Sequence, residues 1–369
     1  MKISITRENL LKVLQTVSGV VEKRQINPIL ANLLFEVNGQ LLVVTGSDLE
    51  IETRAQTQLE SNNSEAFSVT LPALKLMNIV RSLPDGLTVH FEFEDLRCNV
   101  TAGRSRFKLS TLPADDFPVL DLSQIDISIP MTQMQLRRLI HHCSFAMANQ
   151  DVRFYLNGML FDLAGQTIRV VATDGHRLST CSMQLDVEGL STTQAILPRK
   201  GVLELSKILH DSEDLIEFSL ASNYLTVRMN ETVFTCKLID GRFPDYRRVI
   251  PENNTEFVQT DSEMLRSLLQ RASILSNEKF KGVRLVLADN QLAVHASNSE
   301  QDESHEDMAI EYSGANIEIG FNVSYLLDVL GSMNEDCVTL KFKDANSSVL
   351  ISNSTETCDC EHVIMPMRL

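Results

Sequence analysis

The chain has 369 residues, of which 43% are hydrophobic and 22% are charged. At about 100 to 200 residues per domain this length predicts two to three domains, and the composition excludes a generally disordered chain. No apolar run approaches the length of a membrane span and the first residues carry no secretory signal, so we expect a cytoplasmic protein that enters no membrane. The formal net charge of -16 argues against a protein whose whole surface grips DNA phosphates.

Apolar residues spaced i, i+3, i+4 and i+7 occur three times, each time behind a residue that suits a helix N-cap. This spacing places one face of a helix against a core. The caps are Thr6, Thr132 and Asp261, and the stripes behind them are Leu10, Val13, Leu14 and Val17; Leu136, Leu139, Ile140 and Cys143; and Leu265, Leu268, Leu269 and Ala272. The pattern predicts a helix near the start of each third of the chain.

Each of these helices is followed by two alternating strands around a polar turn, which is typical of a β-hairpin. The predicted hairpins cover residues 33–44, 159–171 and 283–294, with turns at Asn38 and Gly39, Ala164 and Gly165, and Asp289 and Asn290. Because Leu34, Leu160 and Leu285 occupy matching positions, the repeat takes about a third of the chain.

A second apolar stripe also recurs, as Leu76, Ile79, Val80 and Leu83; as Val202, Leu205 and Leu209; and as Val323, Leu326, Leu327 and Leu330. Pro72 and Pro198 suit the start of a helix. We therefore predict an α+β fold of three similar domains, residues 1–126, 127–254 and 255–369, each with two helices and two small antiparallel sheets. Such domains joined head to tail form an arc, and a ring if their rotation closes. Repetition alone fits three duplicated domains without a ring equally well.

No residue pattern indicates catalysis or a metal site. Asp174 and His176 are neighbours in a predicted turn without a nucleophile motif, and Cys358 and Cys360 share a strand face without a second pair at ligand spacing. We expect no enzyme activity, no metal and no cofactor. The cysteines are predicted to be reduced core residues: Cys98, Cys143, Cys181, Cys236, Cys337, Cys358 and Cys360.

Longer blocks of sequence resemble a known family. They cover residues 103–107 with 110–113, 149–160, 172–178, 198–201, 240–249, 274–284, 320–325 and 365–369. Together, over all three predicted domains, they resemble the bacterial beta sliding clamps, the beta subunits of DNA polymerase III. The resemblance implies a DNA sliding clamp: a processivity factor that catalyses nothing, encircles duplex DNA as a head-to-tail homodimeric ring and tethers other proteins to it.

Basic residues lie beside the apolar stripes of five of the six predicted helices, among them Lys75 and Lys200. This favours a weakly positive channel within an acidic body, in which DNA is held by topology more than by phosphate contacts. The resemblance adds Arg24, Gln150, Arg153 and Tyr155 as contacts with double-stranded DNA. Leu74 departs from the family, whose members often carry a basic residue there.

Opposite charges predict a head-to-tail joint between two copies of the chain. Arg104 and Arg106 alternate with Phe107 in a predicted strand, whereas the third domain carries an acidic run of Glu300, Asp302, Glu303, Glu306 and Asp307. The acidic run by itself also fits a solvated loop. The resemblance favours the joint and adds Ile274 and Leu275 as its apolar part.

The resemblance also implies a pocket for a partner peptide between the second and third domains. Its residues are mostly apolar, which suits leucine and phenylalanine anchors of a short peptide. They are Leu156, Thr173, Gly175, His176, Arg177, Leu178, Pro244, Arg248, Val249, Asn322, Tyr325, Ser348, Val363, Ile364, Met365, Pro366 and Met367. We expect residues 365–369 to form a pocket wall outside the folding core.

The implied partners are the catalytic subunit of the replicative polymerase, the clamp loader, and other polymerases and repair proteins that carry a clamp-binding motif. A multidomain protein-binding scaffold that does not encircle DNA is the alternative, because it would show the same pocket and acidity. A DNA linkage that survives salt on circular but not on linear duplex distinguishes the two functions.

Overall fold

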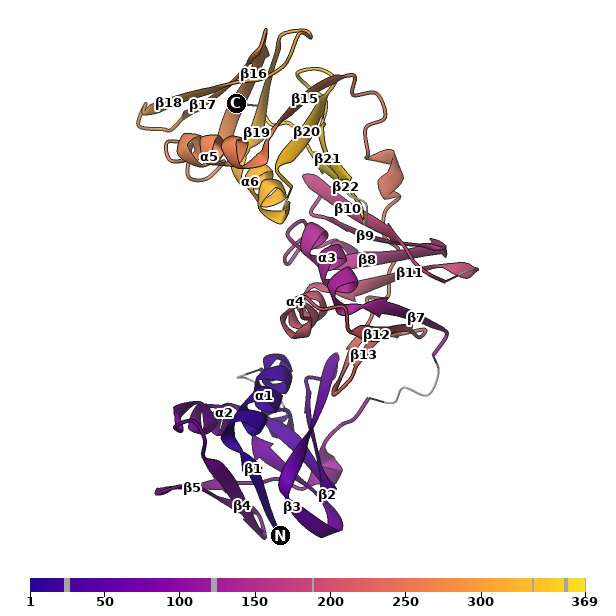
Figure 1. Cartoon of the computed structure of the whole chain (residues 1–369). Coiled ribbons are helices and arrows are strands. Elements are labelled where there is room, and N and C mark those ends of the chain that lie inside the picture. Colours follow the sequence, from indigo (N-terminus) through magenta and orange to yellow (C-terminus); the bar gives the residue numbers. More distant parts are fainter. Residues whose placement is uncertain (23–26, 121–124, 188, 334, 355–357, 369) are drawn as a thin grey trace. The chain divides into compact units, whose positions relative to one another are not determined.

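The structure, a computed structural model, describes residues 1–368 except 23–26, 121–124, 188, 334 and 355–357, and only the backbone of residues 353 and 354. The chain forms two compact units (Figure 1). One unit comprises Met1–Met134 with Leu203–Leu238, and the other comprises Gln135–Val202 with Ile239–Leu369. Within the described ranges, no helix has both the length and the apolar character that crossing a membrane requires.

Each third of the chain begins with a strand and a helix and ends with a second helix and three strands; two long strands lie between the helices in the first third, and four strands in the other two. The first third contains β1 (Lys2–Thr6), α1 (Arg7–Val17), β2 (Asn32–Ser47), β3 (Ile51–Pro72), α2 (Ala73–Ser82), β4 (Thr88–Glu94), β5 (Arg97–Ala102) and β6 (Ser105–Ser110). The second contains β7 (Ile127–Thr132), α3 (Gln133–Ser144), β8 (Gly158–Gly165), β9 (Thr167–Thr173), β10 (Arg177–Gln184), β11 (Leu190–Pro198), α4 (Arg199–Ile208), β12 (Leu215–Leu220), β13 (Tyr224–Met229) and β14 (Thr232–Lys237). The third contains β15 (Glu256–Asp261), α5 (Ser262–Ser273), β16 (Gly282–Ala288), β17 (Gln291–Ser297), β18 (Glu303–Ala309), β19 (Ile317–Asn322), α6 (Val323–Ser332), β20 (Cys337–Phe342), β21 (Val349–Ser354) and β22 (Asp359–Ile364).

The three predicted amphipathic helices are confirmed as α1, α3 and α5. Every residue of their predicted stripes is buried. The Thr6 hydroxyl accepts a hydrogen bond from the backbone N–H of Asn9 at 3.3 Å, and the Asp261 carboxylate accepts one from Met264 at 2.6 Å. These bonds satisfy backbone donors that the first turn of a helix leaves without a partner.

The second predicted stripes lie on α2, α4 and α6, except that Leu83 and Leu209 are buried just beyond the ends of α2 and α4, and the buried face shifts at two places. Met77 is buried on α2 and Ile79 only partly, while on α6 Val329 is buried and Leu327 only partly. In each helix the buried residue lies two positions from the predicted one: Met77 takes the place of Ile79, and Val329 that of Leu327. Such a shift is possible because these helices carry apolar residues on more than one face.

Two of the three predicted hairpins are confirmed, and the first is wrong. β8 pairs with β9 and β16 with β17 around the predicted turns. In contrast, β2 runs through Asn38 and Gly39 and pairs with β3, with shifts of register on either side of Gly39. Gly39 has a φ of 61°, so it suits a β-bulge as well as a turn. The chain reverses later, where the Asp48 carboxylate accepts hydrogen bonds from Glu50 and Ile51.

The predicted small sheets of neighbouring domains join edge to edge. β3 pairs with β14 in a six-stranded sheet of order β2-β3-β14-β13-β12-β7, and β10 pairs with β22 in an eight-stranded sheet of order β11-β8-β9-β10-β22-β21-β20-β15. Two four-stranded sheets, β1-β4-β5-β6 and β18-β17-β16-β19, complete the described topology. Joining satisfies edge N–H and C=O groups that a separate small sheet would expose. The predicted boundaries at residues 126 and 254 lie between strands and stay predictions.

Candidate peptide-binding site

A small apolar cavity lies in the second unit, where β9, β10 and β22 end or begin beside the segment that follows β14. Its volume is about 130 Å³. Its lining comprises Arg153, Leu156, Thr173, Gly175, Arg177, Leu178, Phe243, Pro244, Tyr246, Val249, Val363 and Met365. Val249 and Met365 remain 39% and 41% exposed, so apolar surface is accessible at the cavity mouth.

Nine of the predicted pocket residues surround this cavity. They are Leu156, Thr173, Gly175, Arg177, Leu178, Pro244, Val249, Val363 and Met365. The sequence placed Arg153 on the DNA surface and did not select Phe243 or Tyr246. Phe243 and Tyr246 lie close to Pro244 within the block of residues 240–249 that resembles the family. Their place in that block could have indicated that they line the pocket. The role of these residues in binding stays a prediction.

The other predicted pocket residues lie outside the cavity lining. His176 and Arg248 are exposed, Ser348 and Pro366 are partly buried, and Met367 lines a different hollow with Phe280 and Arg368. Asn322 caps α6 by accepting a hydrogen bond from Ser324 at 2.9 Å. Ile364 is fully buried in the core of the third domain. A side chain in that core is held by packing and cannot contact a ligand in the cavity.

The turn between β9 and β10 is shaped by Asp174 and Gly175. The Asp174 carboxylate accepts hydrogen bonds from the backbone N–H groups of His176 at 2.9 Å and Arg177 at 3.1 Å. Gly175 has a φ of 90°, and a Cβ added there would lie 2.8 Å from the Arg153 guanidinium. The turn therefore requires glycine at position 175. The Asp174 carboxylate, considered above as a possible catalytic group, stabilises this turn through its hydrogen bonds to the backbone.

Arg177 holds the back of the cavity in place. Its guanidinium donates to Asp174 at 3.0 Å, to Asp328 at 2.6 Å and to the carbonyl of Phe145 at 2.7 Å. It also lies 4.4 Å from the ring centre of Tyr325, at cation–π distance. Tyr325, which the sequence assigned to the pocket, thus supports a lining residue.

Tyr246 and Asp162 form a buried pair beneath the cavity. The Tyr246 hydroxyl donates to the Asp162 carboxylate at 2.7 Å, and Arg247 donates to the same oxygen at 2.8 Å. Burial, and then the neighbouring carboxylate, raise the pKa of Tyr246 above its usual range. These bonds fix the aromatic ring that lines the cavity floor.

The end of the chain is tied down beside the cavity. β22 pairs with both β10 and β21 up to Ile364. Beyond Ile364, the backbone N–H of Met365 donates to the carbonyl oxygen of His176 at 3.0 Å. The backbone N–H of Met367 donates to the carbonyl oxygen of Gly320 at 2.9 Å. Val363 and Ile364 therefore belong to the core sheet, and Met365 lies at the cavity rim.

The predicted DNA contacts are spread over several elements. Arg24 lies outside the described residues. Lys75 is exposed on α2, Gln150 is exposed with a φ of 58°, and Tyr155 and Lys200 are partly buried. Arg153 donates to Asp151 at 2.8 Å and lowers the pKa of that carboxyl to about 2. Arg153 thus lines the peptide cavity, and its guanidinium is paired with the Asp151 carboxylate.

Five of the basic helix residues form ion pairs with acidic neighbours. The pairs are Arg7 with Asp85, Lys12 with Glu231, Lys207 with Glu204, Arg266 with Glu263, and Arg271 with Glu306. These five basic residues lie beside the apolar helix stripes, and each pair offsets one positive charge that would otherwise favour a positive channel. Direct attraction of DNA to these helices is therefore weaker.

The predicted joint residues lie at two sheet edges, one in each unit. Arg104 and Arg106 are exposed at β6, the edge of the sheet β1-β4-β5-β6. Glu300 and Glu303 are exposed at or beside β18, the edge of the sheet β18-β17-β16-β19. Ile274 is 75% exposed, whereas Phe107 and Leu275 are partly buried.

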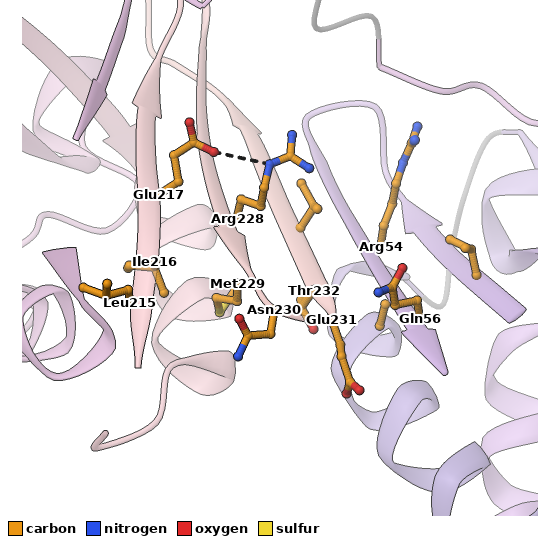
Figure 2. A pocket seen from close by; sticks show the side chains of 13 residues that line it. Arg54, Gln56, Leu215, Ile216, Glu217, Arg228, Met229, Asn230, Glu231 and Thr232 are labelled. Carbon is orange, nitrogen blue, oxygen red and sulfur yellow. Dashed lines mark ion pairs between the residues drawn. The ribbon is translucent and has the colours of Figure 1, made fainter. Parts of the chain in front are cut away.

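A larger hollow, of about 670 Å³, lies over the six-stranded sheet of the first unit. Figure 2 shows Glu217 on β12 and Arg228 on β13 facing each other in it, an ion pair of 3.4 Å, while Arg54 and Gln56 lie on β3, on the far side of β14. None of the predicted site residues within the described part of the chain lines it. Its lining mixes apolar residues with charged side chains such as the paired Glu217 and Arg228, so it suits apolar anchors less well than the smaller cavity.

The cysteines are buried except Cys337, which is exposed at the start of β20. The prediction that all seven are core residues is therefore wrong at this position. A strand end at a sheet surface leaves one side chain in solvent although its neighbours are buried.

Three domains of one α+β architecture, a small apolar cavity and two complementary sheet edges define a three-domain clamp. The comparisons with known proteins agree. Residues 1–121, 130–245 and 247–368 match the N-terminal, central and C-terminal domains of the DNA polymerase III beta subunit. The beta sliding clamp of Pseudomonas putida is 48% identical over 369 residues, which is 100% of both chains.

Solved structures are similar over the same length. The Pseudomonas aeruginosa sliding clamp bound to griselimycin is 46% identical with a TM-score of 0.96, and the match covers 100% of both chains. The C. crescentus beta sliding clamp is 33% identical with a TM-score of 0.94, over 100% of this chain and 99% of that one. The chain belongs to the bacterial beta sliding clamp family. Its function is that of a DNA sliding clamp, and the alternative of a scaffold that does not encircle DNA is not supported.

Proposed function

We propose that two copies of the chain close head to tail into a ring around duplex DNA. The proposal is supported by the two open sheet edges, since an edge strand presents unpaired N–H and C=O groups to a partner strand. Exposed Arg104 and Arg106 at one edge complement exposed Glu300 and Glu303 at the other. The exposed side chain of Ile274 supplies apolar area that the joint would bury.

In this ring DNA is held by topology. Five basic helix residues are engaged in ion pairs, and the chain carries a net charge of -16, so few phosphates can be neutralised. The proposed DNA contacts are Lys75, Gln150, Arg153, Tyr155 and Lys200, with Arg24 as a further contact from the sequence alone. Such a ring slides, catalyses no reaction and works in the cytoplasm.

The cavity of the second unit binds a short peptide from the partner proteins. The observation that carries this proposal is an apolar cavity of about 130 Å³ with Val249 and Met365 exposed at its mouth. Leucine and phenylalanine side chains bury their area well in such a cavity. The partners are the catalytic subunit of the replicative polymerase, the clamp loader, and other polymerases and repair proteins with a clamp-binding motif.

A titration with a fluorescent peptide that contains leucine and phenylalanine anchors tests this assignment. A charge placed in the cavity by Val249→Asp should abolish binding, because the anchors would desolvate a carboxylate. Leu96→Asp, on an exposed leucine of the first unit, is the matched control and should bind as the wild type does. Normal binding by a folded Val249→Asp variant would show that the peptide binds elsewhere.

A further inference from the structure

Four side chains of types that can ligate a metal lie near one another in the interior of the second unit, apart from the peptide cavity. They come from three places: His142 on α3, Cys181 on β10, and Cys358 and Cys360 at β22. All four are buried. A ring nitrogen of His142 and the Sγ atoms of Cys358 and Cys360 lie within 4.8 Å of one another, and the Sγ of Cys181 lies 2.7 Å from that of Cys360.

The strand pairing explains why the three sulfurs converge. Cys358 and Cys360 are two residues apart in extended chain, so their side chains share one face of the sheet. Cys181 is the Cα partner of Cys360 in the ladder of β10 and β22. The sequence predicted no metal site because its spacing shows only two of these ligands.

The ligand atoms of His142, Cys358 and Cys360 are close enough to share one ion, whereas Cys181 lies outside that 4.8 Å group and would have to move to complete a tetrahedral site. With Zn–S bonds of about 2.3 Å, two thiolates on one zinc ion lie about 3.8 Å apart. The Sγ atoms of Cys358 and Cys360 are already 3.9 Å apart. The side chain of Cys181 would move away from Cys360 by about 1 Å, which a change in its χ1 angle can supply.

His142 provides an independent observation. Its Nδ1 is buried and has no hydrogen-bond partner among the described residues. Native proteins rarely leave such a nitrogen without a partner, because the loss of its water is not repaid. A metal ion beside the two cysteines would satisfy a nitrogen of this ring.

We propose that His142, Cys181, Cys358 and Cys360 bind one zinc ion through three sulfurs and one nitrogen. On binding, three S–H bonds break and their protons pass to solvent, while three Zn–S bonds and one Zn–N bond form, with no change of oxidation state. Cys143 is not among the proposed ligands: it lies outside the group of ligand atoms within 4.8 Å of one another, and its thiol donates to the carbonyl of Val170 at 3.6 Å.

The zinc ion would join the central domain, through α3 and β10, to the C-terminal domain, through β22. Leu178 and Val363 line the peptide cavity and belong to the same two strands. The site therefore stabilises the strand pair on which the cavity is built. The proposal does not depend on peptide binding or on ring closure.

A disulfide between Cys181 and Cys360 is the rival interpretation. Their Sγ atoms are 2.7 Å apart, longer than the S–S bond of about 2.05 Å. A disulfide would account for these two side chains only. It would leave unexplained the third sulfur at 3.9 Å and the buried Nδ1 of His142.

The test measures zinc in the full-length protein, prepared under reducing conditions with zinc in the medium and then transferred to metal-free buffer. Elemental mass spectrometry should find one zinc ion per chain in the wild type and in Cys98→Ser, a buried cysteine of the other unit. The double variant Cys358→Ser with Cys360→Ser should lose at least about nine-tenths of it.

A second measurement covers the case in which the double variant does not fold. Wild-type protein loaded with cobalt should show thiolate-to-cobalt charge-transfer absorption and the visible bands of a tetrahedral site. Zinc below about one-tenth per chain together with no cobalt bands would overturn the proposal. So would zinc retained by the double variant, or an intact mass that shows a Cys181–Cys360 disulfide in the reduced preparation.

Discussion

Arg177 on β10 donates to the carboxylate of Asp328 on α6 across 2.6 Å, which links the central domain to the C-terminal domain directly behind the peptide cavity. The Arg177 side chain is only 11% exposed and also donates hydrogen bonds to Asp174 and to the carbonyl of Phe145. One side chain thus couples the turn that shapes the cavity to the helix of the next domain.

We expect Arg177→Ala to lower the free energy of unfolding by about 1.5 to 3 kcal/mol, the usual range for hydrogen bonds to charged groups. Peptide affinity should fall as well, because the cavity wall loses its support. Arg248→Ala is the control: Arg248 is exposed and forms an ion pair with nearby Asp245, so its loss should cost less than about 1 kcal/mol. Equal losses in chemical denaturation would contradict this role of Arg177.

Tyr246→Phe should destabilise the second unit by about 1 to 3 kcal/mol, because the buried Asp162 carboxylate loses a hydrogen-bond donor. Peptide affinity should change little, since the aromatic ring remains in the cavity. Tyr224→Phe, on a partly exposed tyrosine of β13, should leave stability unchanged. Thermal unfolding and peptide titration of the two variants measure both effects. A Tyr246→Phe protein as stable as the wild type would show that Arg247 alone satisfies Asp162.

Deleting residues 365–369 should weaken peptide binding by more than about tenfold, because a lost apolar anchor contact of about 1.4 kcal/mol corresponds to that factor. The melting temperature should change little, since Val363 and Ile364 stay in the sheet between β10 and β21. Met365→Ala should reproduce part of the loss, whereas Met264→Ala, on an exposed methionine of α5, should not. A truncated protein that binds the peptide normally would contradict a role for this segment in the pocket.

Replacing both Arg104 and Arg106 by glutamate should convert the proposed homodimer to monomer. The edge at β6 would then be acidic, and it would repel the acidic edge at β18 of the other copy. Glu306 is already paired with Arg271, so Glu300 and Glu303 are the expected partners. Mixing this variant with Glu300→Arg and Glu303→Arg protein should restore a joint between unlike chains. Light scattering that finds a wild-type monomer at micromolar concentration would contradict the ring.

The sequence predicted the repeat well because helix periodicity and capping are local. Thr6 and Asp261 cap the helices that their spacing indicated. The hairpin at Gly39 failed because a residue with positive φ serves a bulge and a turn equally. The joining of β3 with β14 and of β10 with β22 depends on which edges meet in space, and no local pattern encodes that.

The same limit applies to the sites. Nine lining residues of the cavity followed from the family resemblance, but Phe243 and Tyr246 become lining residues only because the segment after β14 folds over β8 and β9. The proposed metal ligands His142 and Cys181 lie far in sequence from Cys358 and Cys360. Only the pairing of β10 with β22 brings Cys181 to Cys360.

The central claim is that the chain holds DNA by encircling it. The most direct test loads the protein onto nicked circular DNA with an ATP-driven clamp loader, raises the salt concentration, and then cuts the circle with a restriction enzyme. We predict retention on the intact circle at high salt and release from the linear product, because few phosphates are neutralised and the ring can slide off an end. Equal loss from circular and linear DNA as salt rises would contradict the account.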